Sequence, residues 1–497
     1  MARLLLLSVL LVSTCGLVYE LLSATLASYL LGDSITQFSL VIGVYLFSMG
    51  VGSFLSRYVR QQLLETFIRI ELLVGLIGGF SATLLFVFFH LATGFQFLLF
   101  SLLFLTGLLV GLEIPLMMRI LKDRFPFSSL VSHIFTFDYI GALLASILFP
   151  LLLVPQLGLL RTGLLFGLLN ALVALYTIHY FRHQLRGMRG HYVQASLVLL
   201  LLGLGFAGAG HIQDAAEAGA YDDRVLMART TRYQRMVLTQ NTHSTRLFLN
   251  GNLQFDSADE YRYHESLVHP AMVSVDHPRR VLILGGGDGL AVREVLRHAS
   301  VDSITLVELD PEMTRLFGQD PRLSQLNRQA LRDPRVHVVN ADAFRWVQQP
   351  HTPYEVILID FPDPTNFSIA KLYTRHFYQQ LHRLLAPGGV FVVQSTSPYF
   401  APRAFWCVAR TIAAAGFCTL PYHAYVPSFG EWGYVLAARQ PPRPGPMPPN
   451  LRYLNDATFA SMTQFAPDMA ARPVEVNRLS TQVLVQYFED EWNHYVD

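Results

Sequence analysis

In the second half of this 497-residue chain, an acidic residue stands at or just after the end of each of four successive apolar runs. Asp288, Glu308, Asp342 and Asp360 each follow a short run rich in valine, leucine and isoleucine. Carboxylates can hold a cation, accept hydrogen bonds from sugar hydroxyls, or take a proton from a nucleophile. Because the ends of the runs carry only carboxylates, they predict a site for a positively charged nucleoside rather than for a pyrophosphate.

A glycine turn follows the first of these runs, in the order Gly285-Gly286-Gly287-Asp288-Gly289. Glycine between a strand and a helix lets the backbone approach a ligand closely, near the positive end of the helix dipole. No Walker-type lysine follows the turn, and Glu308 stands about 20 residues beyond it, where ribose hydroxyls are held in dinucleotide-type sites. The turn therefore favours a sulfonium nucleoside over NAD.

The apolar runs predict the elements that position these residues. Short continuous runs at 281–284, 303–307, 336–339 and 355–359 are typical of parallel strands buried on both faces, and 290–298 has helical spacing. Ligands of open parallel sheets bind at the carboxyl ends of the strands. We therefore expect a Rossmann-like, methyltransferase-type, doubly wound α/β domain over residues 276–440.

Smaller elements flank this domain. Residues 221–275 are expected to form a small β lid, with a hairpin within 233–255. A proline-rich link over 441–449 should be extended. The tail to residue 497 has helical apolar spacing and is expected to pack on the enzyme or on a membrane face, through Leu479, Val483, Leu484, Tyr487 and Phe488.

The first 212 residues have the composition of a membrane protein. Charged residues are only 15% of the chain, against roughly 25% in soluble proteins, and in this half they cluster between apolar runs. A helix needs roughly 20 apolar residues to span a bilayer, and the first run lacks a clean signal-peptide cleavage site. We predict a multi-pass helical bundle in the cell (inner) membrane with about seven spans, at 4–31, 35–56, 70–90, 95–118, 132–154, 157–181 and 192–210.

Basic residues fall in alternate loops of this half, at Arg57, Arg119 and Arg182 and their neighbours, up to Arg124 in the second loop. Positive charge marks the cytoplasmic side, which places the N-terminus there. An odd number of spans would then put the second half outside the cytoplasm. Either residues 192–210 lie along or re-enter the membrane, or the chemistry is extracytoplasmic; the sequence leaves both open.

Seven segments of the second half together resemble a known family: the spermidine synthases, or polyamine aminopropyltransferases. They are Tyr233-Gln234, 249–254, 259–265, 285–289, 308–310, Asp342 and 360–364. The resemblance covers about residues 233–438, and the fusion to many apolar spans resembles the membrane-bound branch. It implies that decarboxylated S-adenosylmethionine is the cosubstrate and putrescine the typical acceptor, with spermidine and methylthioadenosine as products, no tightly bound cofactor, and a dimer or tetramer.

The resemblance also implies roles for individual residues. Asp360 would be the general base, which an ammonium of pKa near 10 requires before its nitrogen can attack. The donor nucleoside would be held by Gln234, Gln254, Gly285, Gly286, Gly287, Asp288, Glu308, Asp342 and Ala343. The acceptor would be held by Tyr263, His264, Asp363 and Gln394. Within these sets, Asp288 and Gln234 would hold the aminopropyl end, Glu308 the ribose and Asp342 the adenine amino group.

Some of these residues also have ordinary structural explanations, and some positions depart from the family pattern. Asp360 and Asp363 could cap a helix that begins near Leu372. Lys371 brings positive charge to a loop expected over a cationic substrate. The family's acceptor-binding tyrosine near 426–433 has no clear counterpart, and either Phe429 or Tyr425 could take its place. Likewise, Asp342 could be a turn residue, and Tyr263 and His264 could be aromatic packing.

Acidic residues within the apolar runs raise a separate question. Glu20, Glu71, Glu113 and Asp138 are costly in hydrocarbon and need a partner, a proton or a cationic ligand. They could pair with Arg69, Arg119 or His133, or they could form a cation path for a polyamine.

The remaining features exclude other classes of function. A net charge of +1 without a basic block gives no basis for nucleic-acid binding, and the three cysteines lack metal-ligand spacing. A methyltransferase of the same fold, and a polyamine transporter or sensor with a nucleotide-binding soluble domain, are the alternatives to aminopropyl transfer.

Overall fold

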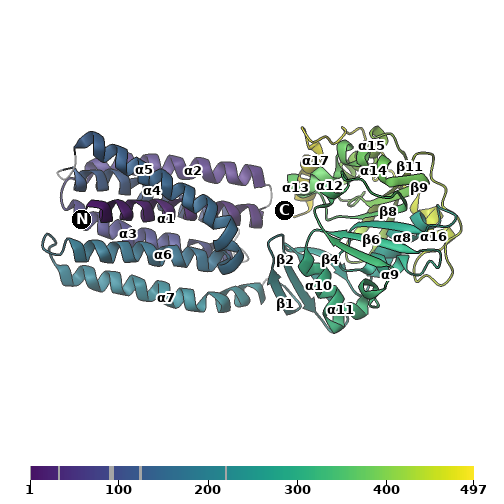
Figure 1. Cartoon of the computed structure of the whole chain (residues 1–497), viewed down its shortest axis with the longest axis horizontal. Helices are drawn as coiled ribbons and strands as arrows, with labels where there is room; N and C mark the ends of the chain where they lie inside the picture. The colour runs from purple at the N-terminus through teal and green to yellow at the C-terminus, as the bar shows by residue number, and fades with distance from the viewer. Residues whose placement is uncertain (1, 32–33, 89–93, 123–125, 219–220, 497) are drawn as a thin grey trace. The chain divides into compact units, whose positions relative to one another are not determined.

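The chain divides into two compact units, Met1–Asp222 and Asp223–Asp497. The structure is a computed structural model that describes residues 2–31, 34–88, 94–122, 126–218 and 221–496 (Figure 1). The predicted span end at His90 and the loop residue Arg124 lie outside the described residues. The two units are described separately below.

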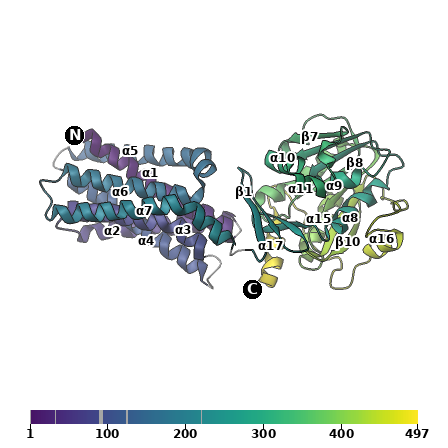
Figure 2. The same cartoon turned by 90° about the horizontal axis from the view of Figure 1, so that it is seen from below.

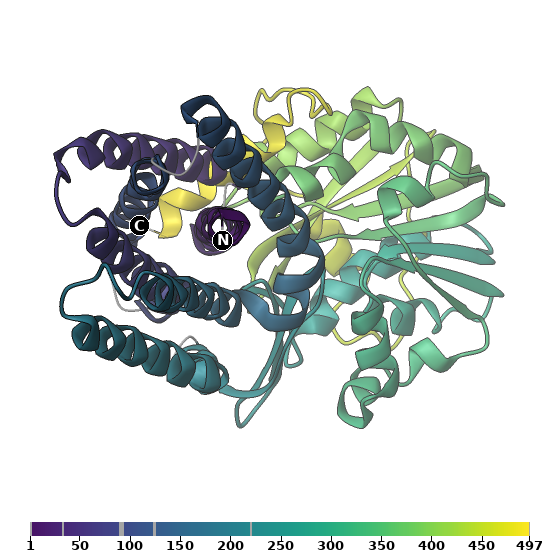
Figure 3. The same ribbon diagram turned by 60° about the vertical axis from the view of Figure 1, so that its left-hand side comes forward.

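The first unit is a bundle of long α-helices, with α1 among the others when they are viewed nearly end-on (Figure 3). Helix α1 contacts each helix from α2 to α6. Glycines allow close packing, since a Cβ on Gly75 would lie 2.8 Å from the backbone oxygen of Gly167. The helices are α1 Ala2–Leu31, α2 Ser34–Leu55, α3 Leu63–Phe88, α4 Phe95–Leu121, α5 Phe127–Leu148, α6 Val154–Tyr180 and α7 Met188–Ala218.

The helices extend beyond the apolar stretches that predicted them. α3 begins at Leu63 rather than at residue 70, α5 begins at Phe127 rather than at 132, and α7 continues to Ala218. Polar residues continue a helix readily, so hydropathy underestimates helix length. Six stretches of the described residues are long and apolar enough to cross a membrane, because α5 and α6, joined by a π-helical turn at Phe149–Leu153, count as one stretch of 54 residues.

The second unit begins with a small antiparallel sheet in the order β1-β2-β3-β4. It has four strands where the sequence predicted a hairpin: β1 Arg224–Thr230, β2 Arg235–Gln240, β3 Thr245–Leu249 and β4 Asn252–Asp256. Its buried face, with Met236, Leu247 and Phe255, packs against Phe317 of α10 (Pro311–Gln319). The small sheet is thus attached to the helix that follows Glu308.

The larger sheet has seven strands in the order β10-β11-β9-β8-β5-β6-β7. Strands β5 to β9 are parallel, and β11 and β10 extend the sheet antiparallel. The order reverses at β5, so the switch point where such folds bind ligands lies there. The strands are β5 Arg280–Gly285, β6 Ser303–Glu308, β7 Val336–Asn340, β8 Tyr354–Asp360, β9 Leu385–Gln394, β10 Cys418–Val426 and β11 Gly430–Ala438.

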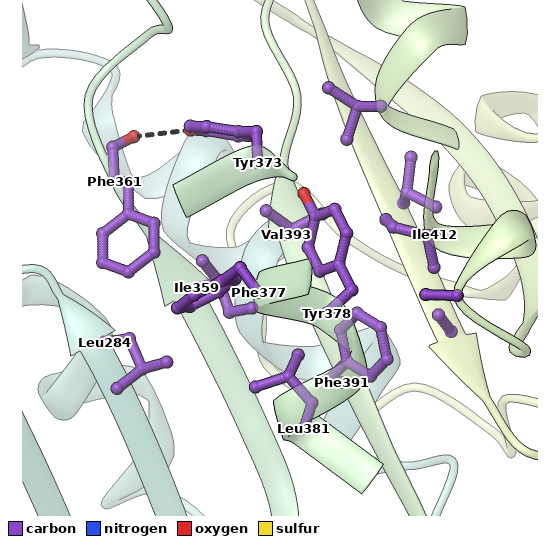
Figure 4. Packing of buried hydrophobic residues seen from close by; sticks show 14 of the residues in the cluster. Leu284, Ile359, Phe361, Tyr373, Phe377, Tyr378, Leu381, Phe391, Val393 and Ile412 are labelled. Carbon is purple, nitrogen blue, oxygen red and sulfur yellow. Dashed lines mark hydrogen bonds between the residues drawn. The ribbon is translucent and has the colours of Figure 1, made fainter. Parts of the chain in front are cut away.

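Helices cover both faces of this sheet, because alternate residues of each strand point to opposite faces. Leu282 and Leu284 face α14 (Arg375–Leu384) and α15 (Pro402–Ala414), as the close-up in Figure 4 shows in part. Val281 and Ile283 face α8 (Glu260–Met272) and α9 (Leu290–Val295). Figure 2 shows α8 and α9 beside the sheet from another side. Strand β7 lies at the edge, and Val338 there is exposed.

The C-terminal tail packs on the second unit. After an irregular proline-rich segment come α16 (Asp456–Met462) and α17 (Val483–Val496). Val483, Leu484, Tyr487 and Phe488 join the core on the α14 and α15 side, whereas Leu479 is exposed and takes no part. The tail is therefore part of the sheet domain's core.

Candidate active site

The strand-end acids converge on the glycine turn. Gly285 pairs in register with Asp360 of the neighbouring strand. A Cβ on Gly286 would lie 3.0 Å from Oδ2 of Asp360, and the backbone amide of Gly287 donates to Oε2 of Glu308 at 3.2 Å. Parallel strands bring residues far apart in sequence to one edge, and here that edge is acidic.

Desolvation makes two of these acids harder to ionise. Burial raises the pKa of Asp288 to about 6, against the opposing positive charge of His264. Burial also raises the pKa of Glu308 to about 7, and the backbone amides of Asp310 and Gly287 partly oppose this. A cationic ligand bound at this edge of the sheet would favour the charged form of both carboxylates.

The small sheet reaches the same edge through Gln234. Its amide nitrogen donates to Oδ2 of Asp310 at 3.2 Å, and Thr231 donates to the same oxygen at 2.7 Å. The family resemblance implies that Gln234 and Asp288 hold the aminopropyl group together. In the structure, the Gln234 side chain forms a hydrogen bond with Asp310. Gln254 lies on β4 and is partly exposed.

Asp342 does have the structural role of an N-cap. Its carboxylate accepts from the backbone amide of Phe344 at 2.9 Å and caps the short helix α12 (Ala343–Trp346). Its other oxygen lies 3.1 Å from Nζ of Lys371. Lys371 is therefore paired with an acid, and Ala343 is buried beneath that cap.

Asp360 is held by Tyr263 from α8. The Tyr263 hydroxyl donates to Oδ1 of Asp360 at 2.5 Å. Burial raises the pKa of Asp360, opposed by the charge of His264 and by the Tyr263 hydroxyl. The Tyr263 ring lies 6.3 Å from the ring of Phe429, whereas Tyr425 is exposed. Of the two candidates for the missing acceptor-side tyrosine, Phe429 is the one that lies beside Tyr263.

His264 belongs to a buried ionic cluster. Its Nδ1 lies 2.8 Å from Oε2 of Glu260, and Arg293 donates to both oxygens of Glu260 at 2.9 Å. Burial opposes a charge on His264, but the hydrogen bond and charge of Glu260 raise its pKa to about 9. His264 therefore carries a positive charge near Asp288 and Asp360 at neutral pH.

Asp363 stands on the loop after β8. Thr396 donates to its Oδ2 at 3.4 Å, and its Oδ1 is buried without a hydrogen-bond partner. Burial raises the pKa of Asp363 to about 7, although contacts with Gln394 and Thr396 oppose the shift. An unpartnered carboxylate oxygen of this kind is poised for a cationic ligand.

Gln394, which was expected to line the acceptor site, contacts Asp363 and also helps to position the loop after β8. It is buried, and its amide nitrogen donates to the backbone oxygen of Phe361 and to the hydroxyl of Tyr373, the latter at 2.9 Å. Tyr373 in turn donates to the same Phe361 oxygen at 3.3 Å (Figure 4). Gln394 and Tyr373 together fix the loop that carries Asp363.

The suggestion that Asp360 and Asp363 cap the next helix is wrong. Asn366 caps α13 (Phe367–Ala370), and Thr374 caps α14. Neither aspartate caps these helices: Asp360 is the last residue of β8, and Asp363 lies on the loop that follows.

The sequence did not single out several residues that shape this site. Glu260, Arg293, Tyr373, Thr396 and Trp432 all lie within the contacts described above or against Tyr263. Glu260 and His264 are four residues apart in a helix, which was a usable signal. Among the described residues, no group of three or more His, Cys, Asp or Glu side chains could hold a metal ion.

Buried acids at the switch point of a mostly parallel, doubly wound sheet are typical of α/β enzymes whose ligands bind at the carboxyl ends of the strands. Within that class, residues 260–443 match the model of the spermine/spermidine synthase domain. The chain is 50% identical to a polyamine aminopropyltransferase of Leptospira interrogans, over 99% of each chain. It is 52% identical to polyamine aminopropyltransferase 2 of Ralstonia nicotianae, over 99% of this chain and 98% of that one.

The chain therefore belongs to the polyamine aminopropyltransferase family, and it is an enzyme of that kind. A solved spermidine synthase in complex with the transition-state analogue AdoDATO is also similar, at 29% identity and a TM-score of 0.46, covering 49% of this chain and 86% of that one.

Proposed function

We propose that this enzyme transfers the aminopropyl group of decarboxylated S-adenosylmethionine to putrescine, with Asp360 as general base. The observation that carries the proposal is the Asp360 carboxylate, whose Oδ1 accepts from Tyr263 and whose Oδ2 lies beside Gly286. Oδ2 takes a proton from the acceptor ammonium, and the freed nitrogen attacks the carbon next to the sulfonium. The C–S bond breaks, and methylthioadenosine leaves as a neutral thioether.

The donor lies along the glycine turn in this proposal. Glu308 binds the ribose hydroxyls, and Asp288 neutralises the aminopropyl ammonium and the sulfonium. Asp342 accepts from the adenine amino group and shares its charge with Lys371. Gln234 and Gln254 close the cleft from the small sheet.

The acceptor lies between Tyr263 and Asp363. The unpartnered Oδ1 of Asp363 holds the far ammonium as an ion pair. The rings of Tyr263, Phe429 and Trp432 lie within 6.5 Å of one another, centre to centre, and cover the methylenes between the two nitrogens. A diamine matches this arrangement, because its two nitrogens can contact the carboxylates of Asp360 and Asp363 while its methylenes contact the aromatic rings.

The same acids disfavour the methyltransferase alternative. Intact S-adenosylmethionine carries a carboxylate that the negative wall formed by Asp288 and Asp360 would repel. A transporter or sensor without chemistry would not need a carboxylate held by Tyr263 next to the donor turn.

We also propose that the first unit is embedded in the cell (inner) membrane and that the enzyme is a homo-oligomer. The six candidate spans support the membrane placement. The alternating basic loops support a cytoplasmic N-terminus. Protease accessibility of the second unit in sealed vesicles distinguishes a cytoplasmic catalytic domain from an extracytoplasmic one.

The deciding experiment supplies the full chain in detergent with decarboxylated S-adenosylmethionine and putrescine. We expect methylthioadenosine and spermidine in equal amounts, and a loss of turnover of roughly 10²–10⁴-fold in Asp360→Asn, the usual contribution of a general base. Asp302→Asn, an exposed acid at the far end of the sheet, is the matched control. Methylation from the intact donor, or undiminished turnover in Asp360→Asn, contradicts the proposal.

A further inference from the structure

A cavity within the first unit brings together three of the acids that the apolar runs contain. Glu20 of α1, Glu113 of α4 and Asp138 of α5 line one space of about 210 Å³. This is several times the roughly 30 Å³ that a water molecule occupies in the liquid. The lining residues all come from helices α1 to α5, so the site belongs to the first unit.

Pairing with the expected cations does not account for these acids. Arg119 donates to the backbone oxygen of Ser56 at 2.9 Å, Arg69 is exposed, and Nδ1 of His133 lies 2.6 Å from the backbone oxygen of Ser129. Glu113 is only 2% exposed, and its Oε1 has no hydrogen-bond partner. Both oxygens of the adjoining Glu71, which is fully buried, are also unpartnered. A buried carboxylate without a partner points to a ligand that the cavity holds.

The spacing of the acids indicates the shape of that ligand. Ser13 donates to the backbone oxygen of Asp138 at 2.8 Å, so Asp138 lies level with Ser13 on α1. Glu20 is seven residues further along α1, about 10 Å at roughly 1.5 Å per residue. Among the described residues, no three such side chains gather closely enough to hold a metal ion. The negative charge is therefore spread along the cavity.

The walls between the acids are apolar. Val12, Leu46, Met49 and Val110 line the cavity. The hydroxyl of Tyr45 in the wall already donates to the backbone oxygen of Gly16 at 2.8 Å. A small hydrated cation would lose its water against such walls, whereas an alkyl chain with a charge near each end matches both the walls and the acids.

We propose that this cavity is a second binding site for an aliphatic polyamine, with Glu20 and Asp138 toward its two ends and Glu113 in its wall. The inference goes beyond the proposed function, because it concerns a different unit and does not depend on which amine the catalytic site accepts. Substrate diamine and product triamine share the required chemistry, and the binding test separates them.

Equilibrium dialysis of the full chain in detergent tests the proposal with labelled putrescine and spermidine, each without donor. We expect close to two equivalents bound for the preferred amine. The double variant Glu113→Gln, Asp138→Asn should lose the equivalent of amine bound in the cavity. Asp363→Asn should lose the equivalent bound at the catalytic site. Ala142→Leu, which fills the cavity and keeps every charge, should also lose one equivalent. Glu65→Gln, an acid of α3 outside the cavity, is the matched control and should keep both.

Three results would overturn the proposal. One is that the wild-type chain binds a single equivalent of amine and that Asp363→Asn abolishes this binding. Another is that the cavity variants still bind two equivalents while gel filtration confirms that they are folded. Release of the amine by millimolar Na⁺ at constant ionic strength would reassign the site to an inorganic cation. Turnover is measured in parallel, so that failure of the cavity proposal can be distinguished from failure of the proposed function. If the chain forms no methylthioadenosine but still binds the amine in the cavity, only the proposed function is contradicted.

Discussion

The hydroxyl of Tyr263 donates to Oδ1 of Asp360 at 2.5 Å, while a Cβ on Gly286 would lie 3.0 Å from Oδ2 of the same carboxylate. One oxygen is therefore held by the helix α8, and the other faces the glycine turn. This division gives the two oxygens different tasks, because Tyr263 orients the carboxylate and Oδ2 remains to accept a proton.

Tyr263→Phe should lower kcat about tenfold, because the hydrogen bond to a charged group contributes about 1.5 kcal/mol. The Tyr263 hydroxyl lowers the pKa of Asp360, so its removal should also shift the acidic limb of the kcat profile to higher pH. Stopped assays of methylthioadenosine across pH measure both effects. Tyr425→Phe, an exposed ring, serves as control; an unshifted limb in Tyr263→Phe would count against the assigned role.

The kcat/KM for putrescine should fall as the pH is lowered through about 7. Burial raises the pKa of Asp363 to about 7, so the carboxyl is neutral below that pH and ionised above it. Only the ionised form can pair with the acceptor ammonium, so kcat/KM for putrescine at saturating donor should rise toward higher pH. Asp363→Asn should flatten this limb and raise the KM for putrescine roughly 10- to 100-fold. A limb that persists in the variant would assign the titration to another group.

Gly287→Ala should weaken donor binding specifically. A Cβ there would lie 2.6 Å from Cγ of Glu308, so the proposed ribose-binding side chain must move. We expect at least a tenfold rise in the KM for decarboxylated S-adenosylmethionine, about 1.4 kcal/mol. A Cβ added at Gly318 in α10 would have no other heavy atom within 4 Å, so Gly318→Ala should leave the KM unchanged. Equal effects of the two substitutions would show that the close approach at Gly287 is unimportant.

Asn477→Ala should destabilise the second unit and loosen the acceptor loop. The buried Asn477 amide donates to the backbone oxygens of Ala370 and Tyr373, at 3.2 and 3.1 Å. Loss of both bonds should cost about 2 kcal/mol in the free energy of unfolding. Denaturant unfolding of the full chain measures this, with the exposed Asn252→Ala as control. An unchanged midpoint would mean that the tail contributes nothing to the loop.

The local part of the site could be predicted from the sequence. The apolar runs, the glycine turn and the acids after each run are short-range patterns, and strand alternation turns them into one edge of a sheet. Asp288, Glu308 and Asp360 meet there because β5, β6 and β8 are parallel neighbours. The small sheet was underestimated, because β1 has a mostly exposed face and a weak apolar pattern.

Other assignments required the three-dimensional structure. The hydrogen-bond partners of the Gln394 amide nitrogen, Phe361 and Tyr373, lie 33 and 21 positions away in sequence. Lys371 pairs with Asp342 at 3.1 Å, across 29 positions in sequence. Because these partners are far apart in sequence, the spacing of neighbouring residues does not predict either set of contacts.

The sequence by itself determined four parallel strands of the larger sheet (β5, β6, β7 and β8), the glycine-rich turn and the acidic strand ends, because those properties depend on side-chain type and local periodicity. Only the tertiary structure decided which polar groups meet: Tyr263 with Asp360, His264 with Glu260, and Glu20, Glu113 and Asp138 in one cavity. The physical reason is that hydrogen bonding and desolvation act over a few ångströms in space, whatever the distance along the chain.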